Sequence, residues 1–242
     1  MVLHCCDARV PAVFSMKILC LTPLKHLPEV FKTLCCQHSV IYRPALTENE
    51  LKRVLEHEKD IDALFVNPNK QTYKLSRSVL MGSSVRLINS ASTGLNHIDL
   101  QACVDFNITV LSLKTDSSLI DTLPSTAELA FGLMLSLLRK IPTSYDSVKE
   151  GHWDYLNFVG RQAAGLTIGI IGYGRLGRLM AKYCAAFDMN VLVYDPYKSS
   201  DSFPVVSLSE LAAKSDVFFF HDTATTETED LIDHAFLKQV IR

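Results

Sequence analysis

The sequence has little charge, and the charge is balanced between the two signs. Charged residues make up 21% of the 242 residues, and the formal net charge is -2. A near-neutral chain offers no electrostatic case for binding nucleic acid or a membrane surface. We therefore expect that the protein binds neither nucleic acid nor a membrane.

Long hydrophobic runs are also missing. The most apolar stretch is residues 129–138, which lies between Glu128 and Arg139. It is too short for a membrane-spanning helix, which needs about 20 residues. The N-terminus has no convincing signal peptide either, because Lys17 interrupts its apolar stretch. These absences lead us to expect a cytoplasmic protein.

A metal-binding pattern is absent from the sequence as well. The chain has seven cysteines, but it contains no C-x-x-C and no Cys/His spacing of the kind that binds zinc. Two adjacent pairs, Cys5-Cys6 and Cys35-Cys36, are poor candidates for a bond within a pair, because disulfide geometry is demanding. We expect reduced thiols and no metal site.

What the sequence does contain is a strand–glycine–helix–strand pattern over residues 165–196. Residues 166–171 form a short apolar, β-branched run that is typical of a buried strand. Apolar residues then recur at helical spacing, and residues 191–194 predict a second strand. The glycines between the first strand and the helix have the spacing G-x-G-x-x-G; they are Gly172, Gly174 and Gly177.

Each part of this pattern suits the binding of a dinucleotide. One glycine permits a tight turn, the next lets the backbone approach a pyrophosphate, and the third lets helix and strand pack closely. The open N–H groups at the helix N-terminus attract phosphate. Asp195 ends the second strand, where a carboxylate can accept hydrogen bonds from both ribose hydroxyls and repels a 2′-phosphate. The pattern predicts NAD as the cofactor; the alternative is a unit whose glycines serve packing alone.

The chain before this pattern alternates short strands with helices from about residue 16 to residue 115. Thr47 and Glu50 have the spacing of a capping box at the start of one of these helices. Another helix is expected at 23–35, with Leu27, Val30, Phe31 and Leu34 on one face. Such alternation predicts a parallel, doubly wound α/β sheet. Residues 1–15 have no periodicity, and we interpret them as an appended segment.

Residues 122–141 predict one long helix that is apolar nearly all round. Such a helix should be buried, either in the core or against a second subunit, and both possibilities stay open. Further along, Ser207 is a candidate helix cap, because Glu210 follows it at capping-box spacing. A strand is expected at 217–220 and a helix at 228–241.

Six short motifs occur along the chain in a fixed order. They are residues 92–99 (STGLNHID), Thr126-Ala127-Glu128, Gly151-His152-Trp153, residues 172–177 (GYGRLG), Tyr194-Asp195-Pro196, and Ser215-Asp216 followed by His221. In these motifs the chain, from about residue 16 to its end, resembles the D-isomer-specific 2-hydroxyacid dehydrogenases. That family includes phosphoglycerate, glyoxylate/hydroxypyruvate and D-lactate dehydrogenases.

The resemblance implies an α/β protein of two doubly wound parallel-sheet units. A flavodoxin-like substrate domain would cover residues 16–115, and an incomplete Rossmann NAD-binding domain would cover residues 116–242. The implied activity is the NAD(H)-dependent interconversion of a 2-oxo acid and a D-2-hydroxy acid, in a cleft between the domains of a homodimer. The sequence does not indicate which 2-oxo acid is used.

Transferred position by position, the resemblance also implies site residues. Ser92, Thr93 and Gly94 would bind the substrate. The residues implied for cofactor binding are Thr93, Gly172, Gly174, Arg175, Leu176, Gly177, Asp195, His221 and Asp222.

The arginine, glutamate and histidine that carry the family's chemistry would fall beyond residue 242. We therefore expect a C-terminally truncated chain with no catalytic residue of its own and with little or no turnover. One alternative is a non-catalytic NAD-binding sensor or a co-repressor-like protein. Another is a dimerisation partner of a full-length homologue.

Overall fold

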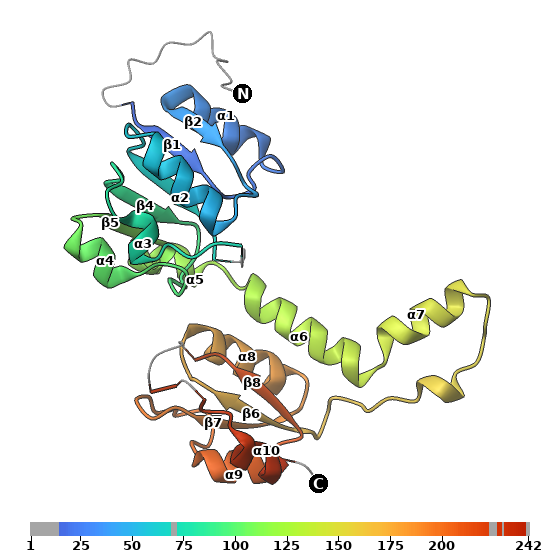
Figure 1. The fold of residues 1–242 in the computed structure, drawn as a ribbon. Coiled ribbons are helices and arrows are strands. Elements are labelled where there is room, and N and C mark those ends of the chain that lie inside the picture. The colour runs from blue at the N-terminus through green and yellow to red at the C-terminus, as the bar shows by residue number, and fades with distance from the viewer. Residues whose placement is uncertain (1–14, 69–71, 223–226, 229, 241–242) are drawn as a thin grey trace. The chain divides into compact units, whose positions relative to one another are not determined.

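A computed structural model of the chain describes residues 15–68, 72–222, 227–228 and 230–240. The chain divides into two compact units, residues 1–120 and residues 121–242 (Figure 1). The sequence placed this boundary after residue 115. Of the segment interpreted as appended, residues 1–14 lie outside the described residues.

The first unit is a parallel sheet with the strand order β2-β1-β3-β4-β5. This is the flavodoxin-like order, so the expected α/β class is confirmed. The strands are β1 (Lys17–Cys20), β2 (Ser39–Tyr42), β3 (Ala63–Val66), β4 (Leu87–Ser90) and β5 (Thr109–Ser112). The helices are α1 (Pro28–Gln37), α2 (Glu48–His57), α3 (Arg77–Leu80), α4 (Leu100–Asp105), the 3-10 turn η1 (Leu113–Thr115) and α5 (Ser117–Asp121).

Helix α2 begins with the capping box that the sequence predicts. The backbone N–H of Glu50 donates to Thr47 Oγ1 at 3.4 Å, and the backbone N–H of Thr47 donates to Glu50 Oε2 at 2.8 Å. These bonds satisfy N–H groups that a helix start leaves open. The helix can then direct Leu51 and Leu55 into the core, where both are buried.

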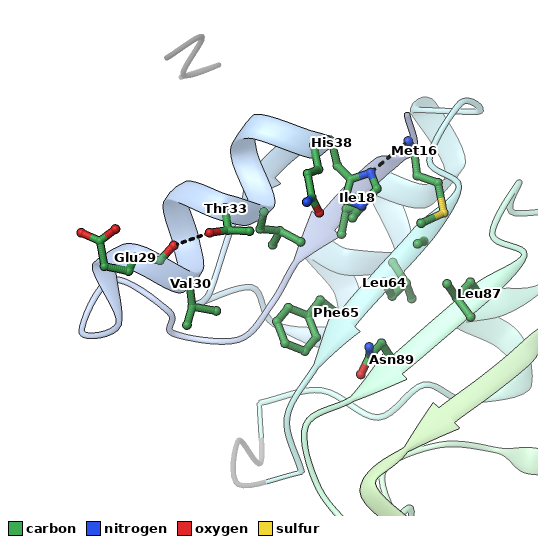
Figure 2. Close-up of a pocket in the computed structure, with 13 residues that line it drawn as sticks. Met16, Ile18, Glu29, Val30, Thr33, His38, Leu64, Phe65, Leu87 and Asn89 are labelled. Carbon is green, nitrogen blue, oxygen red and sulfur yellow. Dashed lines mark hydrogen bonds between the residues drawn. The ribbon is translucent and has the colours of Figure 1, made fainter. Parts of the chain in front are cut away.

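The two faces of this sheet are covered unequally. Helices α2, α3 and α4 share a buried cluster with one face, which presents Leu19, Leu64 and Ile88. On the other face, an open groove of about 510 Å³ separates part of the sheet from α1 (Figure 2). Its floor includes Phe65 and Leu87.

Helix α1 differs from its prediction at its start, and its expected face is only partly buried. It begins at Pro28 rather than at residue 23, because proline suits the first turn of a helix, where its missing N–H costs nothing. Of the four residues expected on one face, Leu27 and Val30 are 45% and 52% exposed, whereas Phe31 and Leu34 are half-buried. Val30 and Leu34 line the groove between α1 and the sheet, while the ring of Phe31 contacts the ring of Tyr42 on β2.

In the described part of the second unit, three parallel strands lie in the order β7-β6-β8. A short parallel bridge between Val193 and Val205 adds a further position beside β7. In chain order this arrangement reads 3-2-1-4, as in a Rossmann sheet. The strands are β6 (Thr167–Ile171), β7 (Asn190–Tyr194) and β8 (Val217–Phe220). The helices are α6 (Ser125–Leu138), α7 (Ile141–Lys149), the 3-10 turn η2 (Leu156–Phe158), α8 (Arg175–Ala186), α9 (Leu208–Lys214) and α10 (His234–Val240).

The expected long helix at 122–141 is α6, and it ends at Leu138. Lys140 has a φ of 52°, in the left-handed region, and this break separates α6 from α7. Ala127, Phe131 and Met134 are buried, whereas the other face leaves Leu129, Leu133 and Leu137 exposed. Within the chain, α6 is therefore buried on one face only, and a second subunit on its other face stays a prediction. No helix in the described ranges is long and apolar enough to cross a membrane.

Four of the described cysteines are free thiols, namely Cys20, Cys35, Cys103 and Cys184. Burial raises the pKa of Cys20 to about 11 and that of Cys184 to about 12, so these two thiols stay protonated. Cys36 is disulfide-bonded, so the expectation of reduced thiols is wrong there. The sequence argument excluded a disulfide between adjacent cysteines, but it did not exclude a disulfide to a cysteine elsewhere in the chain. Cys5 and Cys6 lie outside the described residues.

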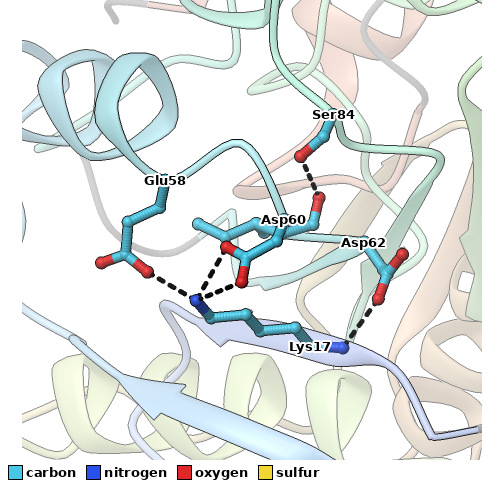
Figure 3. Close-up of polar contacts among 6 residues, drawn as sticks. Lys17, Glu58, Asp60, Asp62 and Ser84 are labelled. Atoms are coloured by element: carbon cyan, nitrogen blue, oxygen red, sulfur yellow. Dashed lines mark hydrogen bonds and ion pairs between the residues drawn. The ribbon is translucent and has the colours of Figure 1, made fainter.

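A network of charges joins the amino ends of the strands in the first unit (Figure 3). The backbone N–H of Lys17 donates to Asp62 Oδ2 at 2.9 Å, and Arg86 Nη2 contacts Asp62 Oδ1 at 2.6 Å. Lys17 Nζ pairs with Glu58 and Asp60 at 2.9 and 2.8 Å. The Lys17 N–H and the Arg86 guanidinium hold the pKa of Asp62 below its usual range.

We expect Asp62→Asn to make unfolding less sensitive to acid. The folded pKa of Asp62 is depressed, so its carboxylate stabilises the fold above the ordinary pKa near 3.9. That contribution is lost as the pH falls through the lower folded value. The variant should be about 1–2 kcal/mol less stable at pH 7, and its stability should fall less between pH 5 and pH 3. Urea unfolding at each pH measures this.

Asp60→Asn is the control, because it removes a carboxylate that is 71% exposed. It should change the stability little, because exposed ion pairs contribute little. Identical pH profiles for Asp62→Asn and the unchanged protein would contradict the assignment of this acid sensitivity to Asp62.

Candidate functional site

A glycine turn joins β6 to α8 at the carboxyl end of the second sheet. Gly172 has a φ of 89°, which glycine adopts without strain. A Cβ on Gly172 would lie 2.8 Å from the backbone N of Asp222, so the turn packs against the end of β8. Tyr173 is buried, and Gly174 is the N-cap of α8.

The third glycine lets α8 start directly against the turn. A Cβ on Gly177 would lie 2.1 Å from the carbonyl O of Gly172, closer than any side chain allows. No side chain of a described residue caps α8, so the N–H groups of its first turn stay open to an anion. The helix dipole adds partial positive charge at the same end. The turn therefore fits the pyrophosphate of a dinucleotide.

Asp195 follows β7 and reaches back to this turn. Its Oδ2 accepts the backbone N–H of Tyr173 at 2.8 Å, and its Oδ1 accepts the N–H of Tyr197 at 2.9 Å. A carboxylate has about four acceptor positions, so both oxygens can still accept hydroxyls. Asp195 thus braces the glycine turn and keeps the capacity to bind a ribose.

His221 and Asp222 follow β8, beside Gly172. The N–H of His221 donates to the carbonyl of Ile171 at 2.8 Å, and its ring stacks on Phe219 with the planes 4° apart. Burial lowers the pKa of His221, so the imidazole is neutral at pH 7. Its Nε2 is buried without a hydrogen-bond partner among the described residues. Such an atom favours a ligand or a water as its partner, which fits a place beside a cofactor.

Arg175 and Leu176 form the first turn of α8, but their side chains lie elsewhere. Nη1 of Arg175 donates to the carbonyl O of Leu123 at 2.6 Å. Leu176 packs against the core of the unit. What these residues offer to a pyrophosphate is therefore the backbone at the start of the helix.

The residues expected to bind substrate lie in the first unit, in the loop after β4. Thr93 and Gly94 are exposed, and the N–H of Gly94 donates to Ser92 Oγ at 3.0 Å. Next to this loop, Nε2 of His97 lies 3.4 Å from Ser90 Oγ. Burial lowers the pKa of His97, so its ring supports the loop in the neutral form.

The structure thus places the expected site residues in two groups, one in each unit. The glycine turn, Asp195, His221 and Asp222 lie together in the second unit, whereas residues 92–94 lie in the first. Sequence reasoning missed Lys198, whose Nζ lies 3.7 Å from the position that a Cβ on Gly174 would take. The sequence did offer one indication of this residue, because Lys198 lies only three residues after Asp195.

Comparison with known proteins tests these assignments at the level of the family. Residues 131–242 match the model of the D-isomer specific 2-hydroxyacid dehydrogenase, NAD binding domain. The D-3-phosphoglycerate dehydrogenase of Methanocaldococcus jannaschii is 34% identical over 224 residues, which are 90% of this chain and 40% of that protein. The chain belongs to the D-isomer-specific 2-hydroxyacid dehydrogenase family. Its cofactor is NAD.

A second curated relative supports the same family. The hydroxypyruvate reductase of Thermotoga maritima is 34% identical over 191 residues, which are 78% of this chain and 59% of that protein. The chain thus spans less than two thirds of either curated relative.

Solved structures of the family share the fold. The D-lactate dehydrogenase of Aquifex aeolicus, complexed with NAD and lactic acid, has a TM-score of 0.70 and 30% identity, over 92% of this chain and 65% of that one. An NAD-dependent formate dehydrogenase of Staphylococcus aureus, in complex with NAD, has a TM-score of 0.77 and 28% identity, over 93% and 70%.

Gly177→Ala should weaken NADH binding by about tenfold or more, which corresponds to about 1.4 kcal/mol. The added Cβ would collide with the carbonyl of Gly172 and push α8 away from the turn. Fluorescence titration with NADH measures the Kd, and circular dichroism checks that the variant is folded.

Gly132→Ala in α6 is the matched control, because a Cβ there meets nothing within 4 Å. Alanine is favoured over glycine inside a helix by about 0.5–1 kcal/mol, so this variant should not lose stability. It should also bind NADH as the unchanged protein does. A folded Gly177→Ala with unchanged NADH affinity would show that the close contact does not shape the site.

Proposed function

We propose that the protein acts in the NAD(H)-dependent interconversion of a 2-oxo acid and a D-2-hydroxy acid. The observation that carries this proposal is the cofactor site: a glycine turn, Asp195 and His221 at one edge of a parallel sheet, in a chain of this dehydrogenase family. Bound NADH supplies the hydride that reduces the keto carbon, and a proton completes the hydroxyl group.

The residues of this chain supply binding and orientation. The open N–H groups of α8 hold the pyrophosphate. Asp195 accepts hydrogen bonds from the adenosine ribose and repels a 2′-phosphate. His221 offers a neutral ring nitrogen beside the cofactor, and the loop with Thr93 and Gly94 receives the substrate carboxylate. These roles for the separate residues are part of the proposal.

We also propose that these 242 residues bind NADH at this site. The relatives named above are enzymes, which favours the dehydrogenase over a sensor or co-repressor-like protein.

Titration of the full chain with NADH and NADPH tests the cofactor half of the proposal. NADH should bind, and NADPH should bind about tenfold or more weakly, because the Asp195 carboxylate opposes the 2′-phosphate. NADH oxidation with a panel of 2-oxo acids tests the rest. Turnover of a 2-oxo acid well above a control without protein would support the proposed reaction, and absence of NADH binding would refute the assigned site.

We further propose that the family's dimer forms through the outer face of α6 and α7. This outer face consists of Leu129, Leu133, Leu137, Ile141, Tyr145 and Val148, each of which is at least half exposed. The three leucines recur every four residues and so form one stripe along the helix. Exposed apolar patches of this kind mark interaction sites. A second copy presents the same stripe, which permits a two-fold symmetric contact.

Leu133→Glu should convert a dimer of the 27.0 kDa chain into a monomer, because it puts a charge into the middle of the stripe. Size-exclusion chromatography with light scattering measures the mass. Leu237→Glu is the control, since Leu237 is an exposed leucine on α10, outside the stripe, and its replacement should leave the dimer intact. If the unchanged chain is monomeric at high concentration, this part of the proposal is wrong.

A further inference from the structure

Lys198 extends toward the glycine turn from the segment that follows β7. Its Nζ lies 3.7 Å from the position that a Cβ on Gly174 would occupy. Gly174 is the glycine whose missing side chain lets the backbone approach a pyrophosphate. The ammonium group therefore lies beside the place where the phosphates of a bound dinucleotide would lie.

In the part of the chain that the structure describes, no ion pair or hydrogen bond involves the side chain of Lys198, so its ammonium group has no carboxylate partner there. The Asp195 carboxylate accepts two backbone N–H groups, and Glu227 accepts the hydroxyl of Tyr197. The N-terminus of α8 carries partial positive charge of its own. Without an anion, the ammonium and the helix end repel each other, so an anion between them would relieve the repulsion.

We propose that Lys198 is a phosphate-binding residue of the cofactor site and that its ammonium pairs with the pyrophosphate of NADH. This inference rests on the proposed binding of NADH at the glycine turn. A lysine suits the contact, because its charge is compact and its stem is flexible. Its partner is the pyrophosphate rather than a 2′-phosphate, because the glycine beside it is the one that admits the pyrophosphate, whereas Asp195 is at the ribose.

A comparison of different cofactors and fragments distinguishes a contact with the pyrophosphate from a contact with a 2′-phosphate. NADH, NADPH and ADP-ribose share the pyrophosphate, whereas only NADPH carries the 2′-phosphate. A contact with the pyrophosphate must therefore strengthen the binding of all three by a similar factor. Adenosine has neither phosphate and serves as the uncharged probe of the same site.

The test compares Lys198→Met with the unchanged full chain. Methionine keeps an apolar stem of similar length and removes the charge. The Kd values for NADH, NADPH and ADP-ribose should each rise about tenfold, equivalent to about 1.4 kcal/mol. The Kd for adenosine should stay within about twofold, and Lys198→Arg should keep most of the NADH affinity, because it keeps the charge.

Lys182→Met is the matched control. Lys182 is exposed on α8, away from the glycine turn, so its replacement removes the same charge without touching the phosphates. NADH affinity should then change by less than about twofold.

Equal NADH affinity in Lys198→Met and the unchanged protein would overturn the inference while leaving the proposed function in place. A loss confined to NADPH would overturn it too, because the 2′-phosphate would then be the partner. If the unchanged protein binds neither NADH nor ADP-ribose, the proposed cofactor site itself fails.

Discussion

The close approach of Gly177 to the carbonyl of Gly172 is the constraint on which the second unit depends. A single Cβ at Gly177 would lie 2.1 Å from that oxygen. Because the helix can start so near the strand, α8 directs its open N–H groups to the carboxyl edge of the sheet. Asp195 and His221 reach the same edge from the ends of β7 and β8, so they meet the start of α8 there.

Both units leave one of their apolar faces partly uncovered. In the first unit, one face of the sheet is covered by three helices, while the other keeps an open groove beside α1. In the second unit, α6 buries Phe131 and leaves a stripe of leucines exposed. Parallel sheets are normally covered on both faces. The stability of the first unit therefore depends mainly on the layer formed by α2, α3 and α4.

Sequence reasoning was most accurate where the physical cause is local. The capping box of Thr47 and Glu50, the cap at Ser207 and the strand before Gly172 all depend on residues a few positions apart, and the structure has them where they were expected. It was less accurate where partners are distant. The burial of Leu27 and Val30 depends on whether α1 closes on the sheet, and periodicity cannot tell which neighbour a helix face will meet.

By itself, the sequence determined the class of fold, the family and the cofactor, because strand and helix periodicity, the glycine spacing and Asp195 are written along the chain. Only the tertiary structure decided how side chains are used. It turned the guanidinium of Arg175 to the carbonyl of Leu123, left Nε2 of His221 without a partner among the described residues, and placed Lys198 beside Gly174. These outcomes depend on contacts between segments far apart in the chain, which local spacing does not encode.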